Sequence, residues 1–257
     1  MIKKINSTIL QNKNVSSSVY LIKLQLNENV PEILPGQFIQ LACPGNEITL
    51  LKRPFSIMNS LDDTIEILYK VVGKGTFNLS QSPVSKKIEM LIPCGNNFSE
   101  PTKNGLNLLI GGGVGIAPLV FLTKKYPSCT FDLWYGTSKE NEKSPIEKWI
   151  GPNVKIHYHS DWKSIDNVEK YQGTIIDAYD NNNSNTPSKI YTCGPTIMMH
   201  KIAEKWSGIP IEVSLEARMA CGFGVCLGCS FETTTGLKTV CSDGPVFSAE
   251  TVIWESL

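Results

Sequence analysis

Four of the eight cysteines lie close together near the end of the chain, at Cys221, Cys226, Cys229 and Cys241. The first three follow the spacing C-x4-C-x2-C, and the fourth comes after a short insert. Plant-type proteins hold a 2Fe–2S cluster through thiolates at this spacing. Glycines between the first three cysteines let the backbone wrap closely around inorganic sulfide and turn N–H groups toward it. The segment therefore predicts a 2Fe–2S cluster with these four cysteines as ligands.

Two other interpretations of the cysteines are a structural zinc site and a disulfide pair. Zinc sites usually space both cysteine pairs tightly, often as C-x2-C twice. Here only Cys226 and Cys229 form such a pair, and the spacing favours the cluster. A one-electron centre needs an electron donor and an electron acceptor, so we expect sites for such groups elsewhere in the chain.

Length and composition predict a soluble globular protein with one large domain or two to three small ones. The chain has 257 residues and is 41% hydrophobic, which is enough for a sizeable core. Lys and Arg total 24, as do Asp and Glu, so nothing in the net charge indicates binding to nucleic acid or to a membrane surface. The beginning of the chain lacks the apolar stretch of a signal peptide, and the four remaining cysteines are scattered. We therefore expect reduced thiols and a cytoplasmic location.

The first hundred residues read as a small antiparallel β-barrel. Residues Val19–Leu26 alternate between apolar and polar, which is typical of a half-buried strand. Further short strands separated by turn signals are predicted at Gln37–Leu41, Arg53–Ile57 and Thr64–Val72. Short strands with frequent turns are typical of closed antiparallel barrels.

Two pieces of this predicted barrel carry chemistry. The strand segment Arg53-Pro54-Phe55-Ser56 can present a cation and a hydroxyl to a flavin and its phosphates, although taken alone it is equally a strand with a surface arginine. The segment Gly73–Ser80 follows a strand and places glycines before Thr76 at a helix start. Such a turn offers free N–H groups to a pyrophosphate, but it also suits an ordinary capped helix.

The middle hundred residues read as an α/β unit that binds a dinucleotide. An apolar strand at Leu106–Ile110 runs into a glycine-rich turn and then a helical pattern over Leu119–Tyr126. The glycines of this turn let the backbone approach phosphate closely, and they are Gly112, Gly113 and Gly115. A glycine turn without a ligand is the alternative. No arginine follows the next predicted strand, Thr130–Tyr135, which favours NAD over NADP, although Lys139 keeps NADP open.

A second turn of this unit also has the position of a ligand site. The predicted strand Lys189–Thr192 leads into Cys193-Gly194-Pro195 and then a helical segment, Thr196–Trp206. This places the turn at the carboxyl edge of the sheet, where ligands bind in such folds. For Cys193 the alternative is a buried thiol at the end of a strand.

Taken together, the motifs resemble those of the ferredoxin–NADP reductase superfamily. The segment Glu216–Phe247, with the four cysteines, narrows the resemblance to the electron-transfer subunits of NAD-dependent dihydroorotate dehydrogenases. The resemblance covers nearly the whole chain. It departs from the family at Phe55, where a smaller aliphatic residue is common, and in the short insert between Cys229 and Cys241.

The resemblance implies three domains: an FAD-binding barrel at 1–100, an NAD-binding α/β domain at 101–210 and a 2Fe–2S domain at 211–257. In the barrel, the residues implied to hold FAD are Arg53, Pro54, Phe55, Ser56, Leu68, Tyr69, Lys70, Gly75 and Thr76. In the α/β domain, the residues implied to receive the nicotinamide nucleotide are Gly112, Gly113, Gly115, Cys193, Gly194 and Pro195.

The implied function is electron transfer in pyrimidine biosynthesis. Electrons leave a catalytic dihydroorotate dehydrogenase subunit, cross the cluster to FAD and reduce NAD, within a complex expected to be a heterotetramer. All three segments are assigned to cofactors, so we expect no dihydroorotate-oxidising site in this chain. One alternative is an NAD(P)H-dependent reductase subunit that serves a ferredoxin, a hydrogenase or an oxygenase. A non-enzymatic module with structural zinc is the alternative from a different class.

Overall fold

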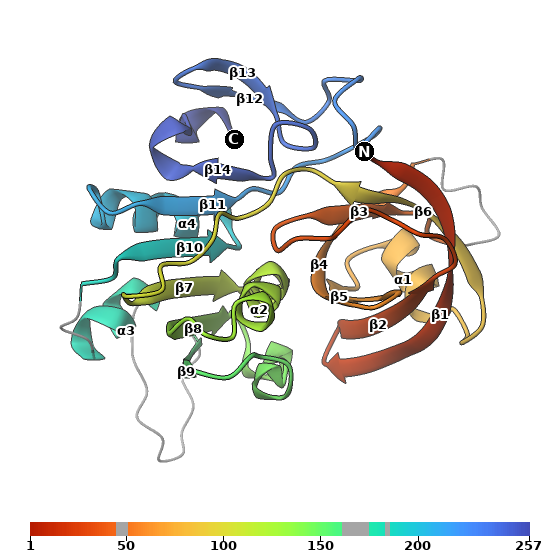
Figure 1. Cartoon of the computed structure of the whole chain (residues 1–257), viewed down its shortest axis with the longest axis horizontal. Helices are drawn as coiled ribbons and strands as arrows, with labels where there is room; N and C mark the ends of the chain where they lie inside the picture. Colours follow the sequence, from red (N-terminus) through yellow and green to blue (C-terminus); the bar gives the residue numbers. More distant parts are fainter. Residues whose placement is uncertain (45–50, 161–174, 183–185) are drawn as a thin grey trace.

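Alternating apolar residues fold the first part of the chain into a closed antiparallel barrel, seen at the right of Figure 1. The computed structural model describes residues 1–44, 51–160, 175–182 and 186–257. In β2, Ile22 and Leu24 point into the barrel and are fully buried, as the alternation predicts. The six strands of the barrel are β1 (Lys3–Ser16), β2 (Val19–Leu26), β3 (Phe38–Leu41), β4 (Arg53–Leu61), β5 (Thr64–Lys70) and β6 (Lys87–Cys94).

The barrel closes in the order β1-β2-β5-β4-β3-β6. A short helix, α1 (Lys74–Ser80), follows β5 and begins at the glycine turn that the sequence indicates. Residues of β3 alternate between the barrel interior and its outside. Ile39 and Leu41 belong to the barrel core, whereas Phe38 packs outside it, together with residues of the C-terminal segment. One outer face of the barrel is thus an interface within the chain.

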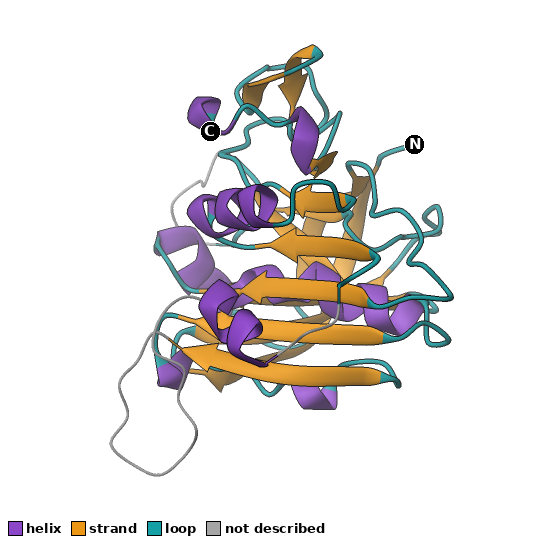
Figure 2. Cartoon of the chain, turned by 90° about the vertical axis from the view of Figure 1, so that its left-hand side faces the viewer, coloured by secondary structure: helices purple, strands orange, loops and turns teal. Residues whose placement is uncertain are grey.

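The second domain is a six-stranded sheet with the order β14-β11-β10-β7-β8-β9. Five strands are parallel, and Figure 2 shows them side by side with helices on both faces of the sheet. The parallel strands are β7 (Asn107–Gly112), β8 (Phe131–Thr137), β9 (Val154–Ser160), β10 (Lys189–Cys193) and β11 (Ile211–Ser214). The helices of this domain are α2 (Ile116–Lys125), α3 (Ile175–Asn182) and α4 (Thr196–Lys205). Helix α2 also contacts β4, so it joins the sheet to the barrel.

The C-terminal segment lies above the other two parts in Figure 1. It forms a hairpin of β12 (Ser230–Thr233) and β13 (Gly236–Thr239), and then returns to the sheet as β14 (Val246–Ser248), antiparallel to β11. Both β11 and β14 lie within the range 211–257, so this segment contributes two strands to the α/β sheet. None of the described helices is long and apolar enough to cross a membrane.

Candidate functional site

The β12–β13 hairpin brings two of the four cysteines together. Cys229 directly precedes β12, and Cys241 follows β13 two residues after its last strand position. The first pair of the hairpin register is Ser230 with Thr239, and the Val240 N–H donates to the Cys229 carbonyl over 3.1 Å. The hairpin therefore holds the third and fourth cysteines at its open end, next to the loop that carries the first two.

The thiols approach one another as two pairs. Burial raises the pKa of the Cys221 thiol, but hydrogen bonds to its sulfur from the backbone N–H groups of Phe223, Cys226 and Val225 and from the Cys226 thiol outweigh burial and lower the pKa to about 6. Burial is the main cause that raises the pKa of the Cys241 thiol. The hydrogen bond with the Cys229 thiol raises this pKa further, to about 12.

Among the described residues, no three His, Cys, Asp or Glu side chains gather around one point. Two thiol pairs side by side suit a cluster of two irons, each of which takes one pair of thiolates.

The loop around the cysteines is shaped to surround a negatively charged group. Gly222 and Gly224 have φ angles of +82° and +86°, in the left-handed region that L side chains rarely adopt. The Gly224 N–H donates to Cys241 Sγ over 3.1 Å. Backbone N–H groups that point at sulfur are the donors that an iron–sulfur cluster requires, so the segment fits the predicted cluster.

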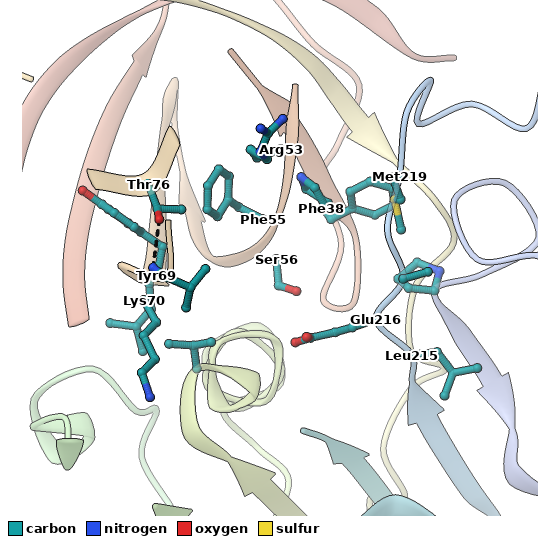
Figure 3. Close-up of a pocket in the computed structure, with 16 residues that line it drawn as sticks. Phe38, Arg53, Phe55, Ser56, Tyr69, Lys70, Thr76, Leu215, Glu216 and Met219 are labelled. Carbon is teal, nitrogen blue, oxygen red and sulfur yellow. Dashed lines mark hydrogen bonds between the residues drawn. The ribbon is translucent and has the colours of Figure 1, made fainter. Parts of the chain in front are cut away.

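A cavity of about 290 Å³ lies between the barrel and the C-terminal segment (Figure 3). Eight of the nine residues implied to hold FAD line it: Arg53, Pro54, Phe55, Ser56, Leu68, Tyr69, Lys70 and Thr76. They supply two cations, three hydroxyls and aromatic surface, a set of groups that fits a flavin and its phosphates. The ninth, Gly75, is buried behind the wall, where an added Cβ would meet Cys43 and Arg53 at ordinary contact distances.

Thr76 has a local role in this wall. Its Oγ1 accepts from the N–H groups of Val72 and Gly73 over 2.9 and 3.2 Å, and the hydroxyl donates to the Gly73 carbonyl over 3.0 Å. The side chain therefore fixes the turn between β5 and α1. Phe55 packs edge-on against Tyr69, with ring centroids 5.8 Å apart, so the departure from the family pattern is accommodated within the cavity wall.

A second cavity, of about 530 Å³, lies at the carboxyl edge of the parallel sheet. Five of the six residues implied to receive the nucleotide line it: Gly112, Gly113, Gly115, Gly194 and Pro195. Cys193 is buried behind them, and burial raises the pKa of its thiol. A Cβ at Gly115 would lie 2.6 Å from the Cys193 carbonyl oxygen, so the two loops pack backbone against backbone. Gly113 differs, because its φ is +56° and nothing lies within 4 Å of an added Cβ.

We call the cavity lined by the residues implied to hold FAD the flavin cavity, and the cavity at the sheet edge the nucleotide cavity. The two share part of their walls. Lys70, Val114 and Glu216 line both of them. Figure 3 shows Ser56 extending into the flavin cavity from the barrel and Glu216 extending into it from the C-terminal segment. The Glu216 carboxyl group is open to solvent through the cavity but lies deep in the fold, and burial there raises its pKa.

The same segment leads on to the cysteines. Met219 also lines the flavin cavity and stands two residues before Cys221. The two cavities and the cysteine loop thus adjoin one another through shared residues and a short segment of chain.

Sequence reasoning missed the part of the flavin cavity that comes from outside the barrel motifs. These wall residues are Phe38, Val72, Val114, Leu215, Glu216, Ala217, Met219 and Pro245. The segment Glu216–Met219 stands out in the sequence only for the cysteines that follow it. In the folded chain this segment follows β11 and lines the flavin cavity. In the nucleotide cavity, the unpredicted lining includes Glu142 and His159.

The C-terminal segment matches a known family. Residues 216–253 match the iron–sulfur cluster binding domain of dihydroorotate dehydrogenase B. Over nearly its whole length the chain is also 32% identical to the dihydroorotate dehydrogenase B (NAD(+)) electron transfer subunit of Clostridium acetobutylicum, covering 95% of each chain. This chain belongs to that family. The electron transfer subunit of Caldanaerobacter subterraneus subsp. tengcongensis is 34% identical, with 98% of this chain and 99% of that protein covered.

Solved structures share the fold of this electron transfer subunit. The structure of an NADH-dependent reduced ferredoxin–NADP oxidoreductase, described for flavin-based electron bifurcation, has a TM-score of 0.84 and 26% identity, covering 98% of this chain and 91% of that chain. A ferredoxin reductase of carbazole 1,9a-dioxygenase has a TM-score of 0.71 at 20% identity, covering 82% and 69%. These likenesses confirm the predicted barrel and α/β architecture. The predicted cofactor set of FAD, a 2Fe–2S cluster and NAD agrees with this family and fold.

Proposed function

We propose that this chain carries electrons between a catalytic dihydroorotate dehydrogenase subunit and NAD in pyrimidine biosynthesis. The observation that carries the proposal is the continuity of the three sites. The nucleotide and flavin cavities share Lys70, Val114 and Glu216, and Met219 links the flavin cavity to the cysteine loop. FAD, when bound, links a two-electron nicotinamide to a one-electron cluster, which is the conversion that such a series requires.

The residues of the chain bind and orient the groups in this series. Arg53 and Lys70 are the cations placed to hold phosphates, and the Ser56 hydroxyl stands on the barrel side of the flavin cavity. The open space beside Gly113 leaves room for the nucleotide backbone at the sheet edge. Val114, on the wall between the two cavities, would lie where nicotinamide and flavin meet. Cys221, Cys226, Cys229 and Cys241 would ligate the cluster.

We infer that NAD rather than NADP is the nucleotide. Glu142 lines the nucleotide cavity just beyond β8, where a ribose is expected to lie, and the Ser138 hydroxyl donates to Glu142 Oε2 over 2.9 Å. A carboxylate in this position repels a 2′-phosphate, and its ion pair with Lys70 offsets part of that repulsion. The relatives from Clostridium acetobutylicum and Caldanaerobacter subterraneus are named for NAD(+), which supports the same choice.

We also propose the domain boundaries of the chain, its cellular compartment and its assembly with a partner. The domains follow the boundaries 1–100, 101–210 and 211–257, and the chain works in the cytoplasm as part of a heterotetramer with the catalytic subunit. All eight cysteines are free of disulfides, which suits a reducing compartment. Phe223, Val225 and Leu227 of the cysteine loop are exposed apolar residues, which favours a protein partner over this loop.

Reconstitution tests the proposed function. The chain is expressed with and without the dihydroorotate-oxidising subunit of its source, and dihydroorotate-dependent reduction of NAD is followed by absorbance. We expect reduction only when both proteins are present, with a native mass of two copies of each. NAD reduction by the partner alone, at an unchanged rate, would contradict the proposal.

A second candidate function is supported by the solved structure with a TM-score of 0.84. That protein is an NADH-dependent reduced ferredoxin–NADP oxidoreductase, so a ferredoxin-linked reductase subunit is the alternative. The partner distinguishes the two. A chain that co-purifies with a ferredoxin-linked protein and prefers NADPH would support the alternative.

A further inference from the structure

Gln40 carries a buried side-chain amide without a hydrogen-bond partner in the described structure. Its side chain is 0% exposed, and neither Nε2 nor Oε1 has a hydrogen-bond partner. Buried amides are hydrogen-bonded in nearly all proteins, because an unpaired one loses its bonds to water without compensation. An orphan of this kind in a well-packed interface therefore indicates a group that pairs with it in the working protein.

The Gln40 side chain lies against the cysteine loop. A Cβ added at Gly222 would lie 2.4 Å from Gln40 Cγ and 2.9 Å from Gln40 Nε2. Gly222 directly follows Cys221, and its φ of +82° turns the backbone there. The amide thus packs on the peptide next to the first predicted cluster ligand, and only a glycine fits between them.

Gln40 reaches this loop from the flavin-binding barrel. It shares the outer face of β3 with Phe38, which lines the flavin cavity and packs in the same apolar cluster as Cys229 and Cys241. In the β3–β4 register, Gln40 lies opposite Pro54, which belongs to the Arg53–Ser56 segment implied to hold FAD. The residue is therefore placed between the flavin cavity and the cysteine loop.

We propose that the Gln40 side-chain amide donates a hydrogen bond to a sulfur atom of the 2Fe–2S cluster and raises its reduction potential. This inference rests on the proposed cluster at Cys221, Cys226, Cys229 and Cys241. Sulfur ligands carry the negative charge of the cluster, and they accept hydrogen bonds from nearby N–H groups. Reduction adds one more negative charge, so a donor at sulfur stabilises the reduced state more than the oxidised one.

The variant Gln40→Met tests the donor. Methionine has a similar length and no N–H, so it fills the same space without the hydrogen bond. We expect full iron and FAD content, and a cluster potential, titrated by EPR, that moves to more negative values. A tenfold change in the reduction equilibrium corresponds to a shift of about 59 mV for a one-electron couple. The flavin potential stays unchanged. The matched control is Gln25→Met in β2, where the Gln25 amide donates to the Leu26 and Asp63 carbonyls, and it shifts neither potential.

Stability of the apoprotein separates this role from a structural one. Gln40→Met removes an unpaired buried amide, so the apoprotein is expected to unfold at the same or a higher temperature. An amide with a purely structural role would instead lower the unfolding temperature and leave the cluster potential unchanged. That pair of results would overturn the proposal.

Two further measurements keep the inference testable if Gln40→Met does not hold iron. Gln40→Glu replaces the donor with an acceptor of the same shape, and we expect a larger negative shift of the cluster potential. In the wild-type protein labelled with ¹⁵N at the glutamine side-chain amide, pulsed EPR of the reduced cluster should detect a nitrogen coupling. Its absence would overturn the proposal. An iron-free wild-type protein would instead contradict the proposed cluster itself.

Discussion

Lys70 of the barrel and Glu142 of the α/β domain form an ion pair, with Nζ 2.8 Å from Oε1. Lys70 lines both cavities and Glu142 lines the nucleotide cavity, so the pair joins two domains where they form the site. The hydrogen bond from Lys70, and to a lesser degree the one from Ser138, lower the pKa of the Glu142 carboxyl group below its usual 4.5, against the opposing effect of burial.

The pair predicts a pH-dependent contribution to stability. A carboxyl group with a lowered pKa stabilises the fold above its unfolded pKa, and this stabilisation is lost as the pH falls through the folded pKa. We expect Glu142→Gln to lower the free energy of unfolding at pH 7 by about 0.2–1 kcal/mol, because the pair is partly exposed. The difference from wild type should shrink as the pH falls below 4.5 and vanish once the pH is below the lowered pKa of the folded state. Urea unfolding at pH 7 and at an acid pH below that folded pKa measures it, with the exposed neighbour Glu140→Gln as control. An equal difference at both pH values would show that the ion pair is not the cause.

Loss of a cysteine ligand should empty the cluster site without affecting the flavin. We expect Cys241→Ser to lower bound iron sharply, because serine replaces a thiolate at the open end of the β12–β13 hairpin. FAD content should stay at the wild-type level, since the barrel motifs are untouched. Iron and flavin analysis of the purified variant measures both. The control is Cys129→Ser, because Cys129 is a buried thiol of the α/β domain outside the cysteine loop. Unchanged iron content in Cys241→Ser would exclude Cys241 as a ligand.

Removal of the Arg53 guanidinium should weaken FAD binding. Its Nη1 donates to the Leu51 carbonyl over 2.6 Å, which holds the side chain at the edge of the flavin cavity. A charge-assisted hydrogen bond to phosphate contributes about 1.5–3 kcal/mol, so Arg53→Ala should raise the Kd for FAD roughly ten- to hundredfold. Fluorescence titration of the apoprotein measures the Kd. Lys87→Ala on β6 serves as control, and equal affinity in Arg53→Ala would remove Arg53 from the site.

A side chain at Gly113 should block the nucleotide. Valine there would extend into the open space that the cavity keeps beside this residue, so Gly113→Val should abolish reduction of an artificial acceptor by NADH. Flavin and cluster spectra should remain those of the wild type. Gly208 also has a positive φ, +90°, and nothing within 4 Å of an added Cβ. Gly208→Val therefore imposes the same kind of backbone strain outside the site. A similar loss of NADH activity in this control would show that backbone strain, and not a blocked nucleotide site, causes the loss in Gly113→Val.

The sequence was sufficient to predict elements with strong periodicity or a glycine turn. Strand β2 has the predicted bounds Val19–Leu26, and the strands around the Gly112 turn and the Cys193 turn lie where expected. Strand β1 (Lys3–Ser16) was missed, because its polar residues hide the alternation and its edges are set by pairing with β2 and β6.

The residues of the candidate site also fall into a predictable and an unpredictable group. Local motifs predict the residues of one segment, such as Arg53 to Ser56. They give no signal for a residue that tertiary packing brings to the site, such as Phe38 or Gln40 from β3 or Glu216 after β11. The antiparallel return of β14 to β11 was equally absent from the sequence pattern, since a strand of three residues is too short to show a period.

Anaerobic titration of the purified chain with NADH tests most directly whether the nucleotide, flavin and cluster sites act in series. Visible absorption follows the flavin and EPR follows the cluster, while dihydroorotate is added to a parallel sample. We expect NADH to reduce both the flavin and the 2Fe–2S cluster in the isolated chain, and dihydroorotate to reduce neither. A flavin that bleaches while the cluster stays oxidised would contradict the series, and reduction by dihydroorotate without a partner would contradict the role as an electron transfer subunit.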